Sequence, residues 1–230
     1  MSLYAIADLH LSLSGEKPMN IFAGWENHIE KLEINWNKTV GEGDAVVVAG
    51  DISWASVIGR AKKDFAFVHE RLNGVKIFIK GNHDYWWTTR AKMDRFLADN
   101  GFDSIRILHN DAYIIGETAV CGSRGWIGED GEEPDRKILK REAGRLEASI
   151  KNGLSKTGEA VVFLHYPPVY ENEENAYILD VLRKYAVKRC YYGHIHGGGA
   201  KNAFTGEKYG IRFGIITADS AGFTPVLIKK

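Results

Sequence analysis

The chain has 230 residues, of which 44% are hydrophobic and 26% are charged, an ordinary composition for a globular protein. Its 30 basic and 30 acidic residues balance, so net charge gives no argument for binding duplex nucleic acid or an anionic membrane. No run approaches the roughly 18 apolar residues of a membrane span, no signal-peptide pattern opens the chain, and two cysteines are too few for a disulfide framework. We therefore expect one cytoplasmic domain over residues 1–230.

The first half of the chain alternates strand and helix patterns. Apolar strands are predicted at 3–7, 45–49 and 75–79, and helices at 25–40, 57–72 and 88–100. The run at 45–49, Ala-Val-Val-Val-Ala, has no polar alternation, which is typical of a strand covered on both faces. This order implies parallel strands joined by right-handed crossovers.

The second half is richer in short strands. Strands are predicted at 104–108, 112–116, 118–122, 160–164 and 187–192, with helices at 135–152 and 174–185. Residues 211–217 and 225–228 are predicted to be closing antiparallel strands. Together the elements predict an α/β fold in which two mixed β-sheets pack face to face, with helices on the outer faces.

Polar side chains with metal-binding chemistry follow five of these strands. In chain order they are Asp8 and His10, then Asp51, then Asn82, His83 and Asp84, then His165, and finally His194 and His196. In open α/β sheets ligands bind beyond the carboxyl ends of the strands, so these loops should share one rim. Each segment alone is more often a turn or a helix cap. Five such segments together favour a site.

The residue types indicate which metals this site would hold. Imidazole and carboxylate without thiolate suit Mn, Fe, Zn or Ni, and Mn, Fe or Zn is expected. Seven candidate ligands exceed one tetrahedral site, and two cations sharing Asp51 would use them all: Asp8, His10, Asp51, Asn82, His165, His194 and His196. Two metals about 3.5–4 Å apart can clamp the attacking and leaving oxygens of a displacement at phosphorus.

The ordered set Asp8-x-His10, Gly50-Asp51, Gly81-Asn82-His83-Asp84, His165 and Gly193-His194-x-His196 resembles the calcineurin-like metallophosphoesterase family. The resemblance spans residues 8 to 196 and implies a four-layer sandwich, two sheets flanked by helices, with a dinuclear metal centre. It implies that Asp8, His10 and His196 hold one metal. Asn82, His165 and His194 would hold the other, with Asp51 bridging and a metal-bound hydroxide attacking phosphorus. His83 would bind the phosphoryl oxygen or protonate the leaving group, and Asp84 would orient His83.

The expected function is therefore metal-dependent hydrolysis of a small phosphorylated substrate, either a phosphomonoester or a phosphodiester. A nucleotide or nucleotide-sugar phosphodiesterase or pyrophosphatase is an alternative, as is a non-catalytic binding scaffold on the same fold. Gly197 to Gly199 after His196 resemble a lipase oxyanion loop, but no Gly-x-Ser-x-Gly turn exists in the chain. Metal identity, substrate and oligomeric state are left open by the sequence.

Other residues near the predicted site have two interpretations each. Arg124, in a glycine-rich loop after a strand, is either a substrate-phosphate contact or a surface arginine. Four tryptophans close to the site loops either stack a base or pack between the sheets, and packing is favoured: Trp54, Trp86, Trp87 and Trp126.

Overall fold

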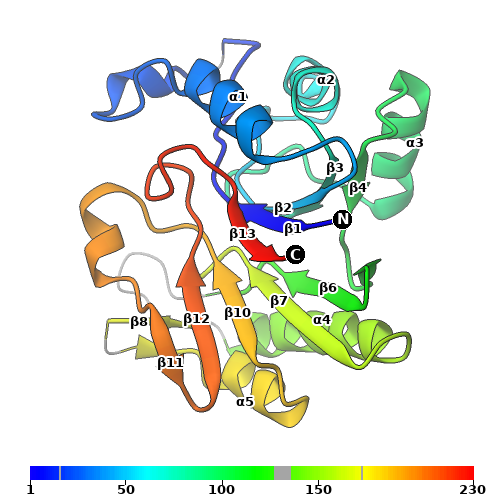
Figure 1. Cartoon of the computed structure of the whole chain (residues 1–230), viewed down its shortest axis with the longest axis vertical. Helices are drawn as coiled ribbons and strands as arrows, with labels where there is room; N and C mark the ends of the chain where they lie inside the picture. The colour runs from blue at the N-terminus through cyan, green and yellow to red at the C-terminus, as the bar shows by residue number, and fades with distance from the viewer. Residues whose placement is uncertain (16, 127–135, 172) are drawn as a thin grey trace.

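A computed structural model describes residues 1–15, 17–126, 136–171 and 173–230 (Figure 1). It is a mixed α/β structure with two large mixed sheets and helices, as expected. The first sheet has the strand order β13-β1-β2-β3-β4 and the second β11-β12-β10-β7-β6-β5. Their strands are β1 (Leu3–Ile6), β2 (Ala45–Ala49), β3 (Val75–Ile79), β4 (Ile105–Ile107) and β13 (Val226–Lys229), and then β5 (Tyr113–Ile115), β6 (Thr118–Ser123), β7 (Glu159–Leu164), β10 (Arg189–Tyr192), β11 (Gly206–Lys208) and β12 (Ile211–Ile215).

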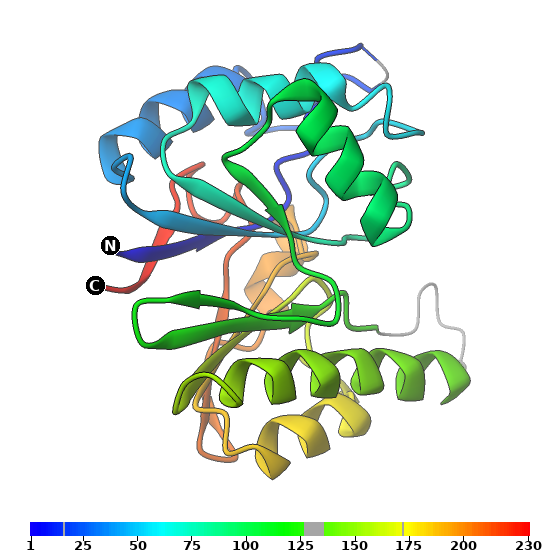
Figure 2. The same cartoon turned by 90° about the vertical axis from the view of Figure 1, so that its right-hand side faces the viewer.

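The helices fall into two groups on either side of the paired sheets. Figure 2 shows α1 (His28–Thr39), α2 (Lys62–Arg71) and α3 (Arg90–Asn100) beyond the first sheet, with α4 (Arg136–Leu154) and α5 (Ala176–Lys184) beyond the second. Smaller elements are the ribbon of β8 (Val169–Tyr170) with β9 (Glu173–Glu174) and the 3-10 helices η1 (Met19–Ile21) and η2 (Gly197–Asn202). No helix in these described ranges combines the length and apolar character needed to cross a membrane.

The first sheet is parallel apart from β13, as the alternating elements predicted. Each of β1 to β4 pairs in parallel with its neighbour, so Ile6 lies opposite Val48 and Ala49 opposite Ile79. All five side chains of β2 are buried, in agreement with its uninterrupted apolar run. The carboxyl ends of β1, β2 and β3 therefore meet at one edge, and the polar loops that follow them meet there too.

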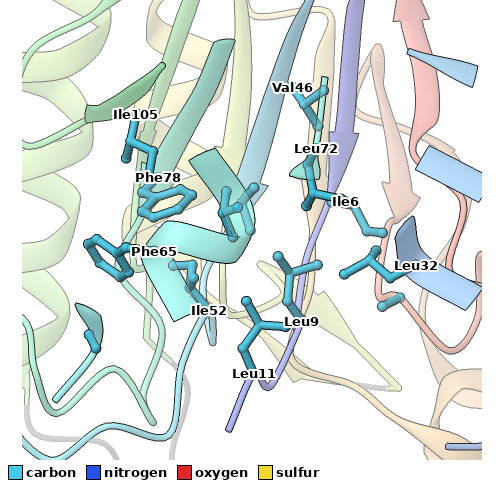
Figure 3. Close-up of a cluster of buried hydrophobic side chains, with 14 of the residues drawn as sticks. Ile6, Leu9, Leu11, Leu32, Val46, Ile52, Phe65, Leu72, Phe78 and Ile105 are labelled. Atoms are coloured by element: carbon cyan, nitrogen blue, oxygen red, sulfur yellow. The ribbon is translucent and has the colours of Figure 1, made fainter. Parts of the chain in front are cut away.

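A hydrophobic cluster beneath that edge anchors the loops. Figure 3 shows Leu9, Leu11 and Ile52 in the same buried cluster as Phe65 and Phe78. Leu9 and Leu11 alternate along the chain with the polar residues of the first loop, and each is at most 1% exposed. Burying such a side chain contributes about 1.5–3 kcal/mol, so these leucines hold the loop against the sheet.

Small side chains line the contact between the two sheets. Ala5, Ala7, Ala45 and Ala49 of the first sheet and its loops are fully buried in a cluster that includes Phe163 from β7. The same cluster holds larger side chains such as Ile77 and Ile79, and the alanines leave room for them between the sheets. The loops at the ends of β7 and β10 in the second sheet meet those of the first at the same edge.

Two details differ from the elements expected from the sequence. α2 begins at Lys62 rather than at 57, because Gly59 lies in a turn and Val57 is 55% exposed instead of packed. β12 runs parallel to β10, since the chain from 193 to 210 is long enough to cross over. The expected antiparallel pairing is found between β12 and β11 and between β13 and β1 of the first sheet.

Candidate metal centre

Five loops that follow β1, β2, β3, β7 and β10 converge on one place between the sheets. Four candidate ligands there have positive φ: 62° at Asp8, 46° at His10, 52° at Asp51 and 72° at His194. Residues with a Cβ rarely adopt this left-handed backbone, which costs on the order of 1–3 kcal/mol at each position. The surrounding hydrogen bonds sustain it: the backbone N–H of His10 donates to the Asp51 carbonyl at 2.9 Å, and that of His194 to Asp8 Oδ2 at 2.9 Å.

Asp8, His10 and His196 form the first group of donors. Asp8 Oδ1 lies 3.1 Å from His196 Nε2 and 3.9 Å from His10 Nε2. The two imidazole nitrogens face each other at 3.2 Å. One ligand atom from each residue lies within 4.8 Å of the others, which is the arrangement that a shared cation requires.

Asn82, His165 and His194 form the second group. Asn82 Oδ1 lies 2.6 Å from His165 Nε2 and 3.1 Å from His194 Nδ1. Asp51 lies between the two groups, because its Oδ1 is 3.6 Å from His165 Nε2 and its Oδ2 is 3.7 Å from His10 Nε2. The two oxygens of one carboxylate thus face different groups of donors. All seven ligands predicted from the sequence lie in this cluster.

Burial and like charge shape the protonation of the cluster. Burial raises the pKa of Asp51 well above its ordinary value, and the carboxylates of Asp8 and Asp84 raise it further. Burial lowers the pKa of both His10 and His165 to about 3, which leaves their imidazoles neutral with a lone pair free for a metal. The buried carboxylates of Asp8 and Asp51 lie beside the neutral imidazoles of His10 and His165. A bound cation would offset the negative charge of the carboxylates and accept the imidazole lone pairs, so these residues fit metal ions.

His196 is tied to a carboxylate that the sequence analysis missed. Its Nδ1 lies 3.2 Å from Asp219 Oδ1, and Asp219 Oδ2 accepts the backbone N–H of Gly197 at 2.8 Å. Burial alone would lower the pKa of His196, but Asp8 and Asp219 raise it to about 10 in the protein without metal. A carboxylate on the second nitrogen fixes the ring orientation of a ligating histidine. The sequence did hold a sign of this role, because Asp219 lies just beyond the strand predicted at 211–217, as the other site residues lie just beyond theirs.

Asp84 is buried beneath the Asp51 loop. Its carboxylate accepts the backbone N–H groups of Asp51, Ile52, Ser53 and Gly81 at 2.7–3.3 Å and the indole N–H of Trp86 at 2.9 Å. Burial raises its pKa to about 6, although these hydrogen bonds oppose the rise. None of these five donors belongs to the His83 ring. The geometry favours a role in shaping the loop of Asp51, and orientation of His83 by Asp84 stays a prediction.

Glycines in the same loops allow the ligands to approach one another. A Cβ on Gly81 would lie 2.0 Å from Asp51 Oδ1, and one on Gly193 would lie 2.4 Å from Asp8 Oδ2. Both contacts are far below van der Waals separation. The glycine of each motif therefore leaves space for a carboxylate ligand.

His83 lies at the open side of the cluster. Its ring is 33% exposed, and its Nε2 lies 4.0 Å from Asp51 Oδ2. Trp54 packs against it with ring centroids 4.3 Å apart and also stacks on His10 at 5.0 Å. The backbone N–H of His83 donates to Asp51 Oδ1 at 2.9 Å. The position suits a group that reaches a substrate without being buried among the ligands.

The remaining tryptophans and Arg124 lie beside the cluster. Trp86 is 1% exposed and packs edge-on to Phe65, which is a core role. The guanidinium of Arg124 lies 4.6 Å from the ring centre of Trp126. The carbonyl of Arg124 accepts the backbone N–H of His165 at 3.2 Å, so the loop after β6 helps to fix the position of the candidate ligand His165.

Comparison with known proteins decides the family. The family model for calcineurin-like phosphoesterases matches residues 1–198. The chain belongs to the calcineurin-like phosphoesterase family. Membership in this family supports metal-dependent phosphoester hydrolysis and implies divalent metal ions, for which the donor groups above are candidates.

Solved structures with low sequence identity share the fold. A protein of unknown function, AQ665 from Aquifex aeolicus, has a TM-score of 0.54 at 15% identity, over 98% of this chain and 94% of that chain. TT1561 of Thermus thermophilus has a TM-score of 0.55 at 14% identity, over 84% of this chain and 81% of the other. The comparison with curated proteins found no match. These structures support the fold alone.

Proposed function

We propose that this chain hydrolyses phosphoric esters with a dinuclear metal centre. Asp8, His10 and His196 would hold one ion and Asn82, His165 and His194 the other, in the four-layer sandwich expected of this family. The observation that carries the proposal is Asp51, whose Oδ1 and Oδ2 face different groups of donors at 3.6 and 3.7 Å. A carboxylate shared between two groups of donors suits two cations better than one.

Metal ions of the Mn, Fe or Zn type would polarise the phosphoryl group and supply a hydroxide nucleophile at neutral pH. The chain itself supplies the remaining functions. His83, with a partly exposed ring beside the centre, is proposed to donate a proton to the leaving oxygen or a hydrogen bond to the phosphoryl group. Asp84 holds the Asp51 loop through three backbone N–H groups and its own loop through that of Gly81, so it keeps the bridging carboxylate in place.

A nucleotide or nucleotide-sugar diesterase is a second candidate, favoured by one observation. Trp54 is half-buried at the mouth of the centre and in contact with His83, where a ring could stack on a base. Trp54→Ala would then raise KM for nucleotide substrates more than for alkyl phosphates. The non-catalytic scaffold is disfavoured, because a scaffold has no need of two complete donor groups in strained backbone.

The test is hydrolysis of p-nitrophenyl phosphate and bis-p-nitrophenyl phosphate by protein loaded with Mn²⁺, Fe²⁺ or Zn²⁺. Turnover should vanish after chelation and return when metal is added back, and the ratio of the two rates separates a monoesterase from a diesterase. Asp8→Asn should abolish turnover. Asp99→Asn, at an exposed side chain of α3 that pairs with Arg95, is the matched control. Absence of turnover with all three metals would refute the proposal.

A further inference from the structure

A cavity separate from the metal ligands lies where the two sheets meet. It has a volume of about 420 Å³ and opens between the ends of β3 and β6 and the flank of α4. None of the seven candidate ligands is among the residues that line it. The volume lies within the range of small-molecule sites, so it can hold a charged group with its attached carbons.

Cations dominate the lining of this cavity, which we term the cationic pocket. Lys80, Arg124 and Arg145 contribute positive charge, and Glu142 carries the one carboxylate among the described lining residues. Arg145 Nη1 donates to Glu142 Oε1 at 2.8 Å, which uses one oxygen of that carboxylate. Among the described residues that line the pocket, no carboxylate hydrogen-bonds to Lys80 or Arg124, so an anion would relieve their mutual repulsion.

Unpartnered polar atoms point to a ligand that makes hydrogen bonds. Within the described residues, Trp87 Nε1, Arg124 Nε and Glu142 Oε2 are buried atoms without a hydrogen-bond partner, and Glu142 as a whole is 0% exposed. Leaving such an atom unsatisfied costs about 1–3 kcal/mol. The indole N–H of Trp87 and the Nε–H of the Arg124 cation suit an anionic acceptor, and Glu142 Oε2 suits a hydroxyl carried by the same ligand.

A titratable residue in the lining reports the same positive field. Burial lowers the pKa of His109, and Arg145 lowers it further against the opposing effect of Asp111. Arg90 and Lys80 also lower it. The field therefore comes from several elements rather than from one side chain.

The cationic pocket shares its framework with the metal centre. Lys80 lies two residues before Asn82 in the loop after β3. The carbonyl of Arg124 accepts the backbone N–H groups of His165 and Tyr166 at 3.2 and 2.9 Å. The loops that present ligands to the metals thus also present cations to the pocket, on the side of the sheets where ligands bind in such folds.

We propose that the cationic pocket binds a second anionic group, a phosphate or a carboxylate, of the substrate whose phosphoester is cleaved at the metal centre. The inference rests on the proposed function. It narrows the substrate class to small, hydroxyl-bearing compounds with two acidic groups, and it assigns Arg124 and Trp87 to recognition of the group that is not cleaved.

The kinetic test uses three series of esters with two to six carbons: alkyl phosphates, alkanediol bisphosphates and phosphorylated hydroxy acids. At one chain length, kcat/KM for an ester with a second acidic group should exceed kcat/KM for the alkyl phosphate of the same length. The expected difference is about tenfold to a hundredfold, the effect of one charged hydrogen bond. The bisphosphate and hydroxy-acid series separate a phosphate preference from a carboxylate preference. Equal kcat/KM across all three series at every length would overturn the inference.

Variants locate the preference in the pocket. Arg124→Gln should reduce the ratio between the preferred ester with a second acidic group and its alkyl phosphate by about tenfold or more. Trp87→Phe, which removes the indole N–H together with part of the ring, should reduce it by about two- to tenfold. Arg95→Gln, at an exposed arginine on α3 outside the pocket, is the charge-matched control and should keep the ratio. Ratios in both pocket variants equal to that of the wild type would overturn the assignment.

A binding measurement separates this inference from the proposed function. Metal-stripped protein is titrated calorimetrically with inorganic phosphate and with acetate. Binding of either anion that is lost in Arg124→Gln supports the pocket even if no ester is hydrolysed. A different result would refute the pocket inference and leave the proposed function standing. In that case esters are hydrolysed without preference for a second anionic group, and the wild type and Arg124→Gln bind phosphate and acetate equally.

Discussion

Substituting Gly81 by alanine tests whether the position of Asp51 governs the metal centre. A Cβ at residue 81 would lie 2.0 Å from Asp51 Oδ1 and 2.2 Å from the Asp51 nitrogen, so one of the two residues must move by about 1 Å or more. The carboxylate cannot turn away without loss, because its Oδ1 accepts the backbone N–H of His83 at 2.9 Å. The backbone is also held, since its N–H donates to Asp84.

The magnitude follows from this geometry. A displacement of about 1 Å at a reacting centre costs on the order of a hundredfold in rate. Inserting a methyl group into a packed site costs about 1–3 kcal/mol of stability. We therefore expect Gly81→Ala to remain folded, to bind less metal than the wild type and to lose about a hundredfold or more in kcat/KM.

The assay combines elemental analysis of the purified variant with kcat/KM on bis-p-nitrophenyl phosphate in excess Mn²⁺. Gly144→Ala is the matched control, because Gly144 lies exposed on α4 and an added Cβ would meet nothing within 4 Å. That variant should be slightly more stable and fully active, since alanine is the better helix former. Wild-type metal content and rate in Gly81→Ala would refute the steric reasoning.

Four further predictions concern the same centre. Asp51→Asn should reduce metal content from two ions per chain to one or fewer by elemental analysis, and two tightly held ions would contradict the bridging role. His83→Ala should keep both ions and lose about 10²–10⁴ in kcat/KM on alkyl esters but much less on nitrophenyl esters, which leave without a proton; an equal loss on both would mean that His83 stabilises phosphoryl charge instead. Asp219→Asn should weaken metal binding by about tenfold to a hundredfold in a competition titration with a chelator, because the His196 ring loses its carboxylate; unchanged affinity would contradict this. Metal at a hundred times its Kd should add about 2.7 kcal/mol to the free energy of unfolding, a rise of about 5–10 °C in calorimetric Tm, and a Tm insensitive to chelation would refute occupancy of the site.

The position of the candidate ligands followed from sequence because one physical rule covers all of them. Polar residues that follow buried parallel strands gather at one edge of the sheet, and Asp8, Asp51 and Asn82 meet there in the structure. The boundaries of β2 and β3 were equally accessible, since apolar runs of five residues define them.

What sequence reasoning missed depends on contacts between distant segments. Asp219 contacts His196 only because β12 lies beside β10, and that pairing has no local signal. The orientation of His83 by Asp84 stays a prediction, but nothing in the sequence indicates the hydrogen bonds that the loop of residues 51–53 donates to the Asp84 carboxylate. The cationic pocket draws on β3, β6 and α4, which no short motif connects.

The small side chains between the sheets have a consequence for the chemistry. Asp8, His10, Asp51 and Asn82 are carried by the first sheet, whereas His165, His194 and His196 are carried by the second. The size of the side chains in that layer, Ala5 and Ala45 among them, therefore also bears on the spacing between the two halves of the candidate ligand set. We expect a larger side chain at either alanine to push the sheets apart and to change the distances between candidate ligands without contacting any of them.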